Sequence, residues 1–447
     1  MFWHLLSQHF LVVAAGLVNV IMVVLILQQK RTPQSALAWL LFTFFLPYLA
    51  LPAYLTLGVR KRRARITPLT FDEQTEDDPD AHPLARTLTR LGGAPASHGN
   101  GFELLSTAEE ARAALYDVIE GAERSIDALF YIVDRDEEGR AFVDALTRKA
   151  EAGVSVRLVL DRLGTLHRPA RALRRLQAAG GTVTFVSPFL TMSSSSHLNL
   201  RNHRKMVIAD DRTAWAGGRN IGAGYLTPGP DEWRDLSFVV TGPVVHRYAE
   251  VFASDAGVPV PPAPAAAWTG PAELQMIAAG PDEPRDVLHD GLVNAIHSAT
   301  ERVWISTPYF IPTEHLAQAL VTAARKGVDV RIMVPDRSNK RTTDLARGAY
   351  MRDIQRNGGR VLRHMGPLLH AKTGVIDNAA WVGSANFDVR SMLLNFETAV
   401  FAYDADTVAT VAAWFAAREP HCEEGVPQVK AFRRTFEGLF RLGAPML

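Results

Sequence analysis

Two long apolar runs open the chain, and no charged residue interrupts either of them. The first is Phe10–Leu27, and the second is Ser35–Gly58, which contains Pro47 and Pro52. About 20 apolar residues are enough to cross a bilayer, and the first run is at the short end of that range. A bilayer tolerates proline kinks where neighbouring groups satisfy the freed carbonyls. The pattern therefore predicts a transmembrane helical hairpin with a basic flank at residues 1–65.

The charges around the two runs suggest an orientation for this hairpin. No lysine or arginine precedes the first run and a second run follows at once, which argues against a cleaved signal peptide. The basic segment Arg60–Arg65 outweighs the pair Lys30-Arg31. By the positive-inside rule, the downstream chain and the N-terminus both lie in the cytoplasm. We expect a multi-pass protein of the bacterial cell membrane with its remaining domains on the cytoplasmic side.

Residues 66–100 show no sustained hydrophobic period. They contain the acidic run Asp72–Asp80 and several prolines and glycines, with a short helix expected around Pro83–Leu91. Such a composition is typical of a linker.

Beyond the linker, helical and strand periods alternate. Helices are expected at Glu109–Ala122, Gly139–Ala152 and Pro169–Ala179, and strands at Ser125–Val133, Val154–Leu160 and Thr182–Val186. Alternating strands and helices predict an α/β fold with mainly parallel sheets and helices on both faces.

The same order then recurs. Ala299–Ile305 echoes Ala122–Ile126, and Gly327–Asp336 echoes Gly153–Asp161, with a nearly constant offset along the chain. A constant offset indicates an internal duplication.

The duplication divides the globular part into two related halves. They are residues 101–256 and residues 272–447, joined by a Pro- and Ala-rich seam at 257–271. The second half ends in the amphipathic segment Phe432–Leu442, which fits either an interfacial helix or an ordinary packed helix.

One motif occurs in both halves with every gap identical, in the form H-x-K-x4-D-x6-G-[GS]-x-N. Its members are His203, Lys205, Asp210, Gly217, Gly218 and Asn220 in the first half, and His370, Lys372, Asp377, Gly383, Ser384 and Asn386 in the second. Two copies at identical spacing indicate a functional site that the duplication doubled.

The residue types of the motif point to an anionic ligand. Short apolar strands are expected at Val207–Ala209 and Gly374–Ile376, and alternate residues of an extended chain point to one side, so each histidine should project with its lysine. The glycines allow close backbone approach to an anion, and Asn220, Ser384 and Asn386 can add donors. Two halves folded face to face would bring both sets to one site. The natural guest is a phosphate diester.

Composition narrows the chemistry. The net charge is +1, so charge does not argue for nucleic acid, and the one cysteine excludes a cysteine-built metal site. Only 8 of the 48 basic residues are lysines, yet both motifs keep one. A compact ammonium differs from a planar guanidinium, so the site has a specific need for lysine.

Histidine–lysine pairs can transfer a phosphoryl group without a metal or cofactor, and we expect neither here. One imidazole attacks phosphorus and forms a phosphohistidine. The other protonates the leaving alcohol and then deprotonates the incoming one. The lysines stabilise charge on the non-bridging oxygens.

The two H-x-K-x4-D motifs resemble those of the phospholipase D superfamily. Together with the apolar runs, the acidic linker and stretches such as Thr307–Pro312, the whole chain resembles bacterial cardiolipin synthases. The resemblance implies that Asp235 and Glu397 hold the histidines. It also implies that His203 is the nucleophile and His370 the acid and base. We expect Asp210 and Asp377, which close the motifs of the two catalytic sets, to bond nearby backbone and not to carry protons.

The resemblance also implies a reaction. A phosphatidyl group would pass from one phosphatidylglycerol to the enzyme, and a second phosphatidylglycerol would take it to give cardiolipin and glycerol, with the bilayer as the other partner. A membrane-bound phospholipase D, or a transferase with another alcohol acceptor, is the alternative, and an inactive lipid-binding protein is a remote one. Gly218 stands where the second motif has Ser384, so the two half-sites differ slightly.

Overall fold

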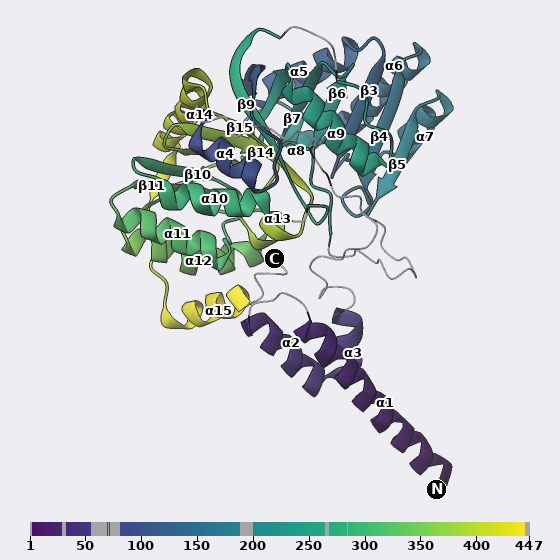
Figure 1. The fold of residues 1–447 in the computed structure, drawn as a ribbon, viewed down its shortest axis with the longest axis vertical. Helices are drawn as coiled ribbons and strands as arrows, with labels where there is room; N and C mark the ends of the chain where they lie inside the picture. Colours follow the sequence, from purple (N-terminus) through teal and green to yellow (C-terminus); the bar gives the residue numbers. More distant parts are fainter. Residues whose placement is uncertain are drawn as a thin grey trace. The chain divides into compact units, whose positions relative to one another are not determined.

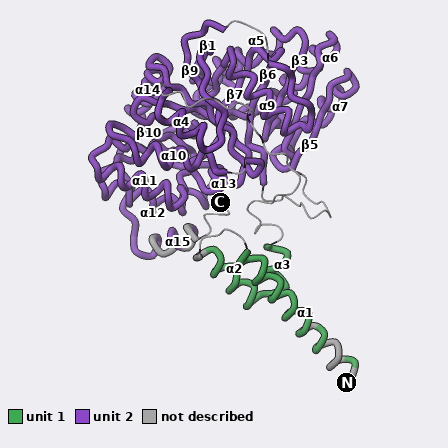
Figure 2. The backbone as a smooth tube through the Cα atoms, in the orientation of Figure 1, with its two compact units in different colours: residues 1–64, 189–199 green, residues 65–188, 200–447 purple. Residues whose placement is uncertain are grey.

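The computed structural model describes residues 2–28, 33–54, 69, 71, 81–187, 200–263, 268–283 and 285–442. The basic flank Arg60–Arg65 and the acidic run Asp72–Asp80 lie outside the described residues. The chain divides into two compact units, residues 1–64 with 189–199, and residues 65–188 with 200–447 (Figure 2).

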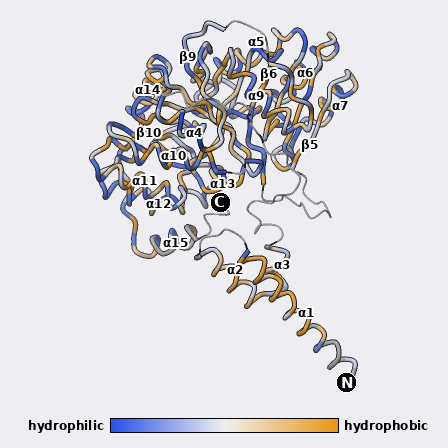
Figure 3. The backbone as a smooth tube through the Cα atoms, in the orientation of Figure 1, coloured by the Kyte–Doolittle hydropathy of each residue, from blue (hydrophilic) through white to orange (hydrophobic). Residues whose placement is uncertain are grey.

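The first unit consists of three apolar helices, α1 (Phe2–Leu27), α2 (Pro33–Phe45) and α3 (Pro47–Ala53), which form the most continuously hydrophobic part of the chain (Figure 3). Pro47 divides the second apolar run, because a proline lacks the amide hydrogen of a helix interior and suits a first turn. Within the part of the chain described, none of the helices combines the length and apolar composition of a bilayer crossing. The predicted transmembrane hairpin is therefore not supported by the structure.

Both halves of the second unit have an α/β fold built on one sheet each (Figure 1). The first sheet has seven strands in the order β2-β8-β7-β6-β3-β4-β5. Its strands are β2 (Gly101–Leu105), β3 (Ser125–Phe130), β4 (Ser155–Asp161), β5 (Thr182–Val186), β6 (Met206–Ala209), β7 (Thr213–Gly217) and β8 (Ser237–Thr241). The helices of this half are α5 (Ala108–Glu120), α6 (Glu137–Glu151), α7 (Ala170–Ala178), α8 (Ala223–Leu226) and α9 (Val244–Ala256).

The second sheet has nine strands in the order β1-β9-β15-β14-β13-β10-β11-β12-β16. Its strands are β1 (Ser97–Gly99), β9 (Gly270–Ala279), β10 (Arg302–Ser306), β11 (Asp329–Pro335), β12 (Arg360–His364), β13 (Thr373–Ile376), β14 (Ala379–Gly383), β15 (Glu397–Ala402) and β16 (Cys422–Glu424). Its helices are α10 (Val287–Ser298), α11 (Glu314–Arg325), α12 (Arg341–Arg356), α13 (Val389–Leu393), α14 (Ala405–Arg418), the short 3-10 helix η2 (Glu419–His421) and α15 (Ala431–Leu442).

The expectation of mainly parallel sheets was wrong. Parallel pairing is limited to β3–β4–β5 in the first sheet and β10–β11–β12 in the second. The motif strands form antiparallel hairpins, β6–β7 and β13–β14, whose turns hold only a few residues. Tight turns of this length can join antiparallel strands only, whereas parallel strands need a long crossover.

Residues 83–99, expected to be linker with a short helix, are built into the second half. Helix α4 (Pro83–Arg90) buries Leu84 and Leu88 in the same core as α10, and β1 pairs with β9. The amide of Gln275 on β9 donates to the carbonyl of Ala94 at 2.7 Å. The apolar face of α4 explains why this segment packs.

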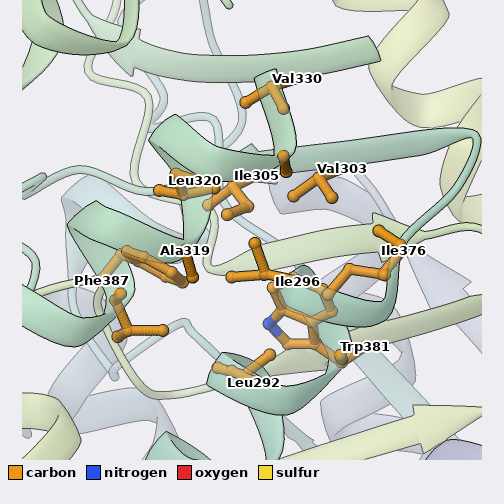
Figure 4. Packing of buried hydrophobic residues seen from close by; sticks show 14 of the residues in the cluster. Leu292, Ile296, Val303, Ile305, Ala319, Leu320, Val330, Ile376, Trp381 and Phe387 are labelled. Atoms are coloured by element: carbon orange, nitrogen blue, oxygen red, sulfur yellow. The ribbon is translucent and has the colours of Figure 1, made fainter. Parts of the chain in front are cut away.

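Three large hydrophobic cores hold the described part of the second unit together. One lies between the first sheet and α5–α7. Another lies between the second sheet and α10–α12, where Ile296, Val303 and Trp381 meet (Figure 4). The third contains residues of both sheets, including Met206 and Val375. Since β6 sends alternate side chains into two cores, its uninterrupted apolar sequence is explained.

Two structures were predicted for the amphipathic segment at the C-terminus, an interfacial helix and a packed helix. The structure shows a packed helix. Helix α15 lies against α12, where Glu437 is only 2% exposed and pairs with Arg352. Arg433, one turn earlier on α15, lies 3.4 Å from Glu437.

Candidate active site

The two motifs meet through segments that cross between the halves. The amide of His203 donates to the carbonyl of Phe396 at 2.9 Å, and the amide of Phe396 donates to the carbonyl of Arg201 at 2.9 Å. In the reverse direction, the amide of His370 donates to the carbonyl of Arg234 at 2.8 Å. The backbone of each histidine is therefore hydrogen-bonded to a chain segment of the other half.

These segments carry the acidic residues, so each histidine is held by the other half. Nδ1 of His370 lies 2.5 Å from Oδ2 of Asp235. Nδ1 of His203 lies 3.4 Å from Oε1 of Glu397. A carboxylate on Nδ1 orients the ring and sets its tautomer, leaving Nε2 for chemistry.

The two carboxylates are ionised at neutral pH. Both are fully buried, which acts to raise the pKa of Asp235, but the charge of Lys372 and the hydrogen bond from His370 outweigh burial and hold that pKa below its usual range. Burial likewise acts to raise the pKa of Glu397, and the hydrogen bond from His203 and the charge of Lys205 lower it overall.

The surroundings of both histidines favour the neutral form of the ring. Burial lowers the pKa of His203, against the opposing charge of Glu397. Burial also lowers the pKa of His370, and the charge of Lys372 adds to that effect. The His203 side chain is 20% exposed and the His370 side chain 8%, so His203 is the more accessible of the two rings.

The lysines are buried beside the histidines that precede them. Both lie just before their strands β6 and β13, and each ammonium donates to the carbonyl of the histidine two residues earlier. Nζ of Lys372 also lies 3.5 Å from Oδ2 of Asp235. Burial lowers the pKa of Lys205 and of Lys372, in each case against nearby carboxylates.

The aspartates that close the motifs accept hydrogen bonds from backbone amides, as expected. The carboxylate of Asp210 accepts amide hydrogens from Glu123, Arg124 and Ser125 at 2.7–2.8 Å. The carboxylate of Asp377 accepts from the amides of residues 300, 301 and 302 at 2.9–3.0 Å. Both residues turn the chain between paired strands at positive φ, 55° and 48°. Their contacts give them a structural role and correct their grouping with the catalytic residues.

The glycines of the motifs lie against other protein groups. They were expected instead to let the backbone approach an anion. A Cβ on Gly217 would lie 2.6 Å from the carbonyl oxygen of Leu236, and one on Gly383 would lie 2.4 Å from that of Thr398. A Cβ on Gly218 would lie 2.2 Å from Oδ1 of Asp235. The small residues thus allow the neighbouring strand and the Asp235 carboxylate to come close.

The remaining polar members of the motifs bind protein groups next to the histidines. Oγ of Ser384 donates to Oε2 of Glu397 at 2.5 Å. Oδ1 of Asn220 accepts the amide hydrogen of Ile132 at 3.1 Å, which ties the end of β3 to the first motif. Asn386, its counterpart in the second half, is 6% exposed. The Ser384 hydroxyl, which was expected to donate to a ligand, thus donates to Glu397, and the Asn220 carbonyl holds backbone.

The side chain of Arg204 points away from the two catalytic residues beside it and joins the halves. It is fully buried and lies 2.9 Å from Asp255 and 3.2 Å from Asp282. Its Nε donates to the carbonyl of Glu397 at 3.3 Å. This buried ion cluster fixes the chain between His203 and Lys205.

Aromatic rings surround both histidines, and of these residues only Tyr309 lies in a stretch noted from the sequence. The ring of Tyr131 lies 4.1 Å from that of His203 between centroids. The rings of Trp233, Tyr225 and Tyr309 lie 5.2, 5.6 and 6.3 Å from that of His370. Tyr131 follows β3 and Tyr309 follows β10, which are equivalent strands of the two halves, and this repetition was the signal available in the sequence.

Asp161, the last residue of β4, holds the segment that leads into the first motif. Its Oδ2 accepts the amide hydrogen of Asn202 at 3.0 Å, and its Oδ1 lies 3.5 Å from Arg201. It is 1% exposed. It therefore fixes the approach to the first motif.

Comparisons with known proteins agree with this geometry. Residues 115–256 and 292–418 match the family described as cardiolipin synthase, PLD-like domain, and residues 17–58 match the family described as phospholipase D–nuclease N-terminal. Cardiolipin synthase A of Pseudomonas fluorescens (strain SBW25) is 35% identical over 401 residues, which cover 84% of each chain. Cardiolipin synthase A of Pseudomonas putida (strain W619) is 33% identical over 430 residues, which cover 90% of each chain.

A solved structure shows the same fold. The phosphatidylserine synthase of Haemophilus influenzae Rd KW20 has a TM-score of 0.61 and 16% identity over 77% of this chain and 95% of that chain. At this identity the likeness concerns the fold alone.

Proposed function

The chain belongs to the family of cardiolipin synthases with phospholipase D-like domains, and from this premise we propose that it joins two phosphatidylglycerols to give cardiolipin and glycerol. The observation that carries the proposal is the pair of histidines, each held on Nδ1 by a carboxylate of the other half. That pair supplies one nucleophile and one acid–base group, which is what a two-step transfer at phosphorus requires.

In the first step, neutral His203 attacks through Nε2. A P–N bond forms to the phosphatidyl group, and the bond between phosphorus and the glycerol oxygen breaks. His370 gives its Nε2 proton to that oxygen, and glycerol leaves. The anionic diester raises the pKa of a nearby imidazole, so substrate binding itself favours the protonated form of His370. The greater exposure of the His203 side chain, 20% against 8%, supports its assignment as nucleophile.

In the second step, the hydroxyl of another phosphatidylglycerol replaces glycerol. His370 takes its proton, the P–O bond of cardiolipin forms, and the P–N bond to His203 breaks. Lys205 and Lys372 lie beside the rings, and their ammonium groups stabilise charge on the non-bridging oxygens in both steps. Asp235 and Glu397 keep both rings oriented throughout.

Two other outcomes of the same chemistry define the alternatives. If water is the acceptor, the protein is a phospholipase D, and if the acceptor is another alcohol, it is a different phosphatidyltransferase. An inactive lipid-binding protein is disfavoured because both histidine–lysine sets are intact.

The deciding experiment uses the purified full chain in detergent with labelled phosphatidylglycerol and a chelator, followed by separation of the products. Cardiolipin and glycerol in equal amounts support the proposal. Phosphatidic acid with glycerol identifies water as the acceptor and rejects the synthase. His203→Ala and His370→Ala serve as inactive controls.

Membrane attachment through the first unit is part of the proposal. Large apolar side chains of α1 and α2 are exposed, among them Phe10 at 73%, Leu17 at 62% and Phe44 at 73%, and a lipid surface is a natural cover for them. The charge of Arg60–Arg65 supports a hairpin with the catalytic unit on the cytoplasmic side.

Cysteine labelling tests this arrangement. Cys422 is the one native cysteine, so Cys422→Ser gives a background for single cysteines at Gln29, between the apolar runs, and at Gly229, in the catalytic unit. The hairpin predicts that an impermeant maleimide labels Gln29→Cys in intact spheroplasts, and Gly229→Cys only after permeabilisation. Protection of both positions in intact cells would instead indicate a helix pair that stays at the inner surface.

A further inference from the structure

A cardiolipin synthase must bind two phosphates at once, because the acceptor phosphatidylglycerol carries a phosphate that does not react. The lysines of the two motifs serve the reacting phosphate and donate to the carbonyls of their own histidines. A second anion needs further cations close by. The need for such a second anion site follows from the proposed function and depends on it.

The two halves differ in charge just after their motifs, although the spacing of the two copies is identical. Asn220 of the first half is followed by Gly222 and Gly224. Asn386 of the second half is followed, at the same spacings, by Asp388 and Arg390. The second half has therefore acquired charged side chains where the first has none.

Arg390 lies on α13, directly before the segment that holds His203. Oδ1 of Asp388 caps this helix by accepting the amide hydrogen of Ser391 at 2.8 Å. The carbonyl of Arg390 accepts the amide hydrogen of Asn395 at 2.9 Å, and Nδ2 of Asn395 lies 3.4 Å from Oε1 of Glu397. These contacts place Arg390 on the side of the site where His203 receives its carboxylate.

Lys340 approaches from the other direction, on the loop between β11 and α12. Its Nζ lies 4.6 Å from the ring centroid of Tyr309. The hydroxyl of Tyr309 donates to Oδ1 of Asn339 at 2.5 Å, and its ring lies 6.3 Å from that of His370. Lys340 is also exposed, so its ammonium can meet an incoming headgroup. It is one of 8 lysines in a chain with 48 basic residues.

The electrostatics agree with this placement. The charge of Lys340 contributes to lowering the pKa of His203. The charge of Arg390 acts to lower the pKa of Tyr131, whose ring centroid lies 4.1 Å from that of His203. Asp388, 5% exposed, interacts with the charges of both Lys340 and Arg390. Both cations therefore contribute positive charge on this side of the site.

We infer that Lys340 and Arg390 bind the non-reacting phosphate of the acceptor phospholipid and so direct the phosphatidyl group to a phospholipid instead of to water or a small alcohol. The first half has glycines at the positions corresponding to Asp388 and Arg390, so the donor and acceptor sides of the site are distinguished by the second half alone.

The experiment lets two acceptors compete for one phosphatidyl-enzyme. Labelled phosphatidylglycerol serves as donor and as anionic acceptor, and ethanol is the neutral acceptor that has no phosphate. We expect Lys340→Gln and Arg390→Gln each to lower the ratio of cardiolipin to phosphatidylethanol about tenfold, the change that about 1.4 kcal/mol of lost binding produces. Lys340→Arg keeps the charge and should restore most of the ratio.

The ratio is internal to each sample, so a partly misfolded variant does not distort it. Arg337→Gln is the matched control, since Arg337 is a cation of the same loop whose side chain is 92% exposed, and its ratio should equal that of the wild type. An unchanged ratio in both Lys340→Gln and Arg390→Gln overturns the inference. A wild-type enzyme that forms phosphatidylethanol but no cardiolipin overturns the proposed function instead, and the acceptor site with it.

Discussion

His203 of the first half is oriented by Glu397 of the second, with 3.4 Å between Nδ1 and Oε1. The pseudo-equivalent pair, His370 and Asp235, crosses in the opposite direction. Glu397→Gln keeps the shape of the side chain but removes the charge that stabilises the imidazolium, so we expect kcat to fall about 100-fold or more with little change in KM. Steady-state kinetics measure this, with the exposed Glu314→Gln as control. Wild-type kcat in Glu397→Gln would contradict the assigned role.

The roles of the two histidines can be separated with an activated donor. A phosphatidyl ester of nitrophenol has a leaving group that needs no proton. We expect His370→Ala to release a stoichiometric burst of nitrophenolate from this ester and His203→Ala to release none, since only the nucleophile is required for that step. Stopped-flow absorbance follows the burst. The reverse pattern would make His370 the nucleophile.

Two buried groups, His203 and Lys372, should shape the pH profile of kcat/KM. His203 attacks only when neutral, and burial lowers its pKa, so activity is lost as the pH falls through a value below about 6.5. Burial also lowers the pKa of Lys372, so activity is lost as the pH rises through a value below about 10.4. Lys372→Arg should move the alkaline limb upward, because a guanidinium stays charged. An acid limb above pH 6.5 would argue against a buried nucleophile.

Arg204 should be essential for stability. Replacing it with methionine leaves Asp255 and Asp282 buried without their cation, and breaking a buried pair in this way costs about 3–5 kcal/mol. Chemical denaturation of the purified protein measures the loss. Arg204→Lys keeps one charge and should lose less. Equal stability of Arg204→Met and the wild type would mean that the cluster contributes nothing net.

Gly218→Ser copies the second motif into the first and should nevertheless inactivate the enzyme. The new Cβ would lie 2.2 Å from Oδ1 of Asp235, which would have to move away from His370. We expect kcat to fall about 100-fold. Gly229→Ser, where a Cβ would meet nothing within 4 Å, is the control. Retained activity in Gly218→Ser would show that Asp235 can shift without cost.

Many of the local elements and contacts around the motifs were predicted correctly from the sequence. The duplicated order placed β4, β5 and α7 within a residue or so of their observed bounds, and Asp210 and Asp377 lie on backbone as expected. These features are local, because the strands, turns and caps depend on neighbouring residues. The acidic partners were identified by resemblance, and the sequence did not tell which histidine each one holds.

The features that were missed depend on packing over long distances. The crossing of Asp235 and Glu397 follows from how the halves face one another, and no spacing within one half contains that information. The sheets were expected to be mainly parallel because the strand–helix alternation was read beyond β5 and β12, where hairpins take over. The second apolar run was read as one helix, but Pro47 divides it.

The exchange of carboxylates between the halves has a consequence for the making of the protein. A nascent chain that has emerged only through the first half contains His203 but no Glu397, and Asp235 has no His370 to hold. His370 can meet Asp235 as soon as it is made, but His203 has no carboxylate until β15 of the second sheet is in place. We therefore expect a chain that ends before β15 to have little activity toward lipids, so that folding of the complete chain acts as an activation step.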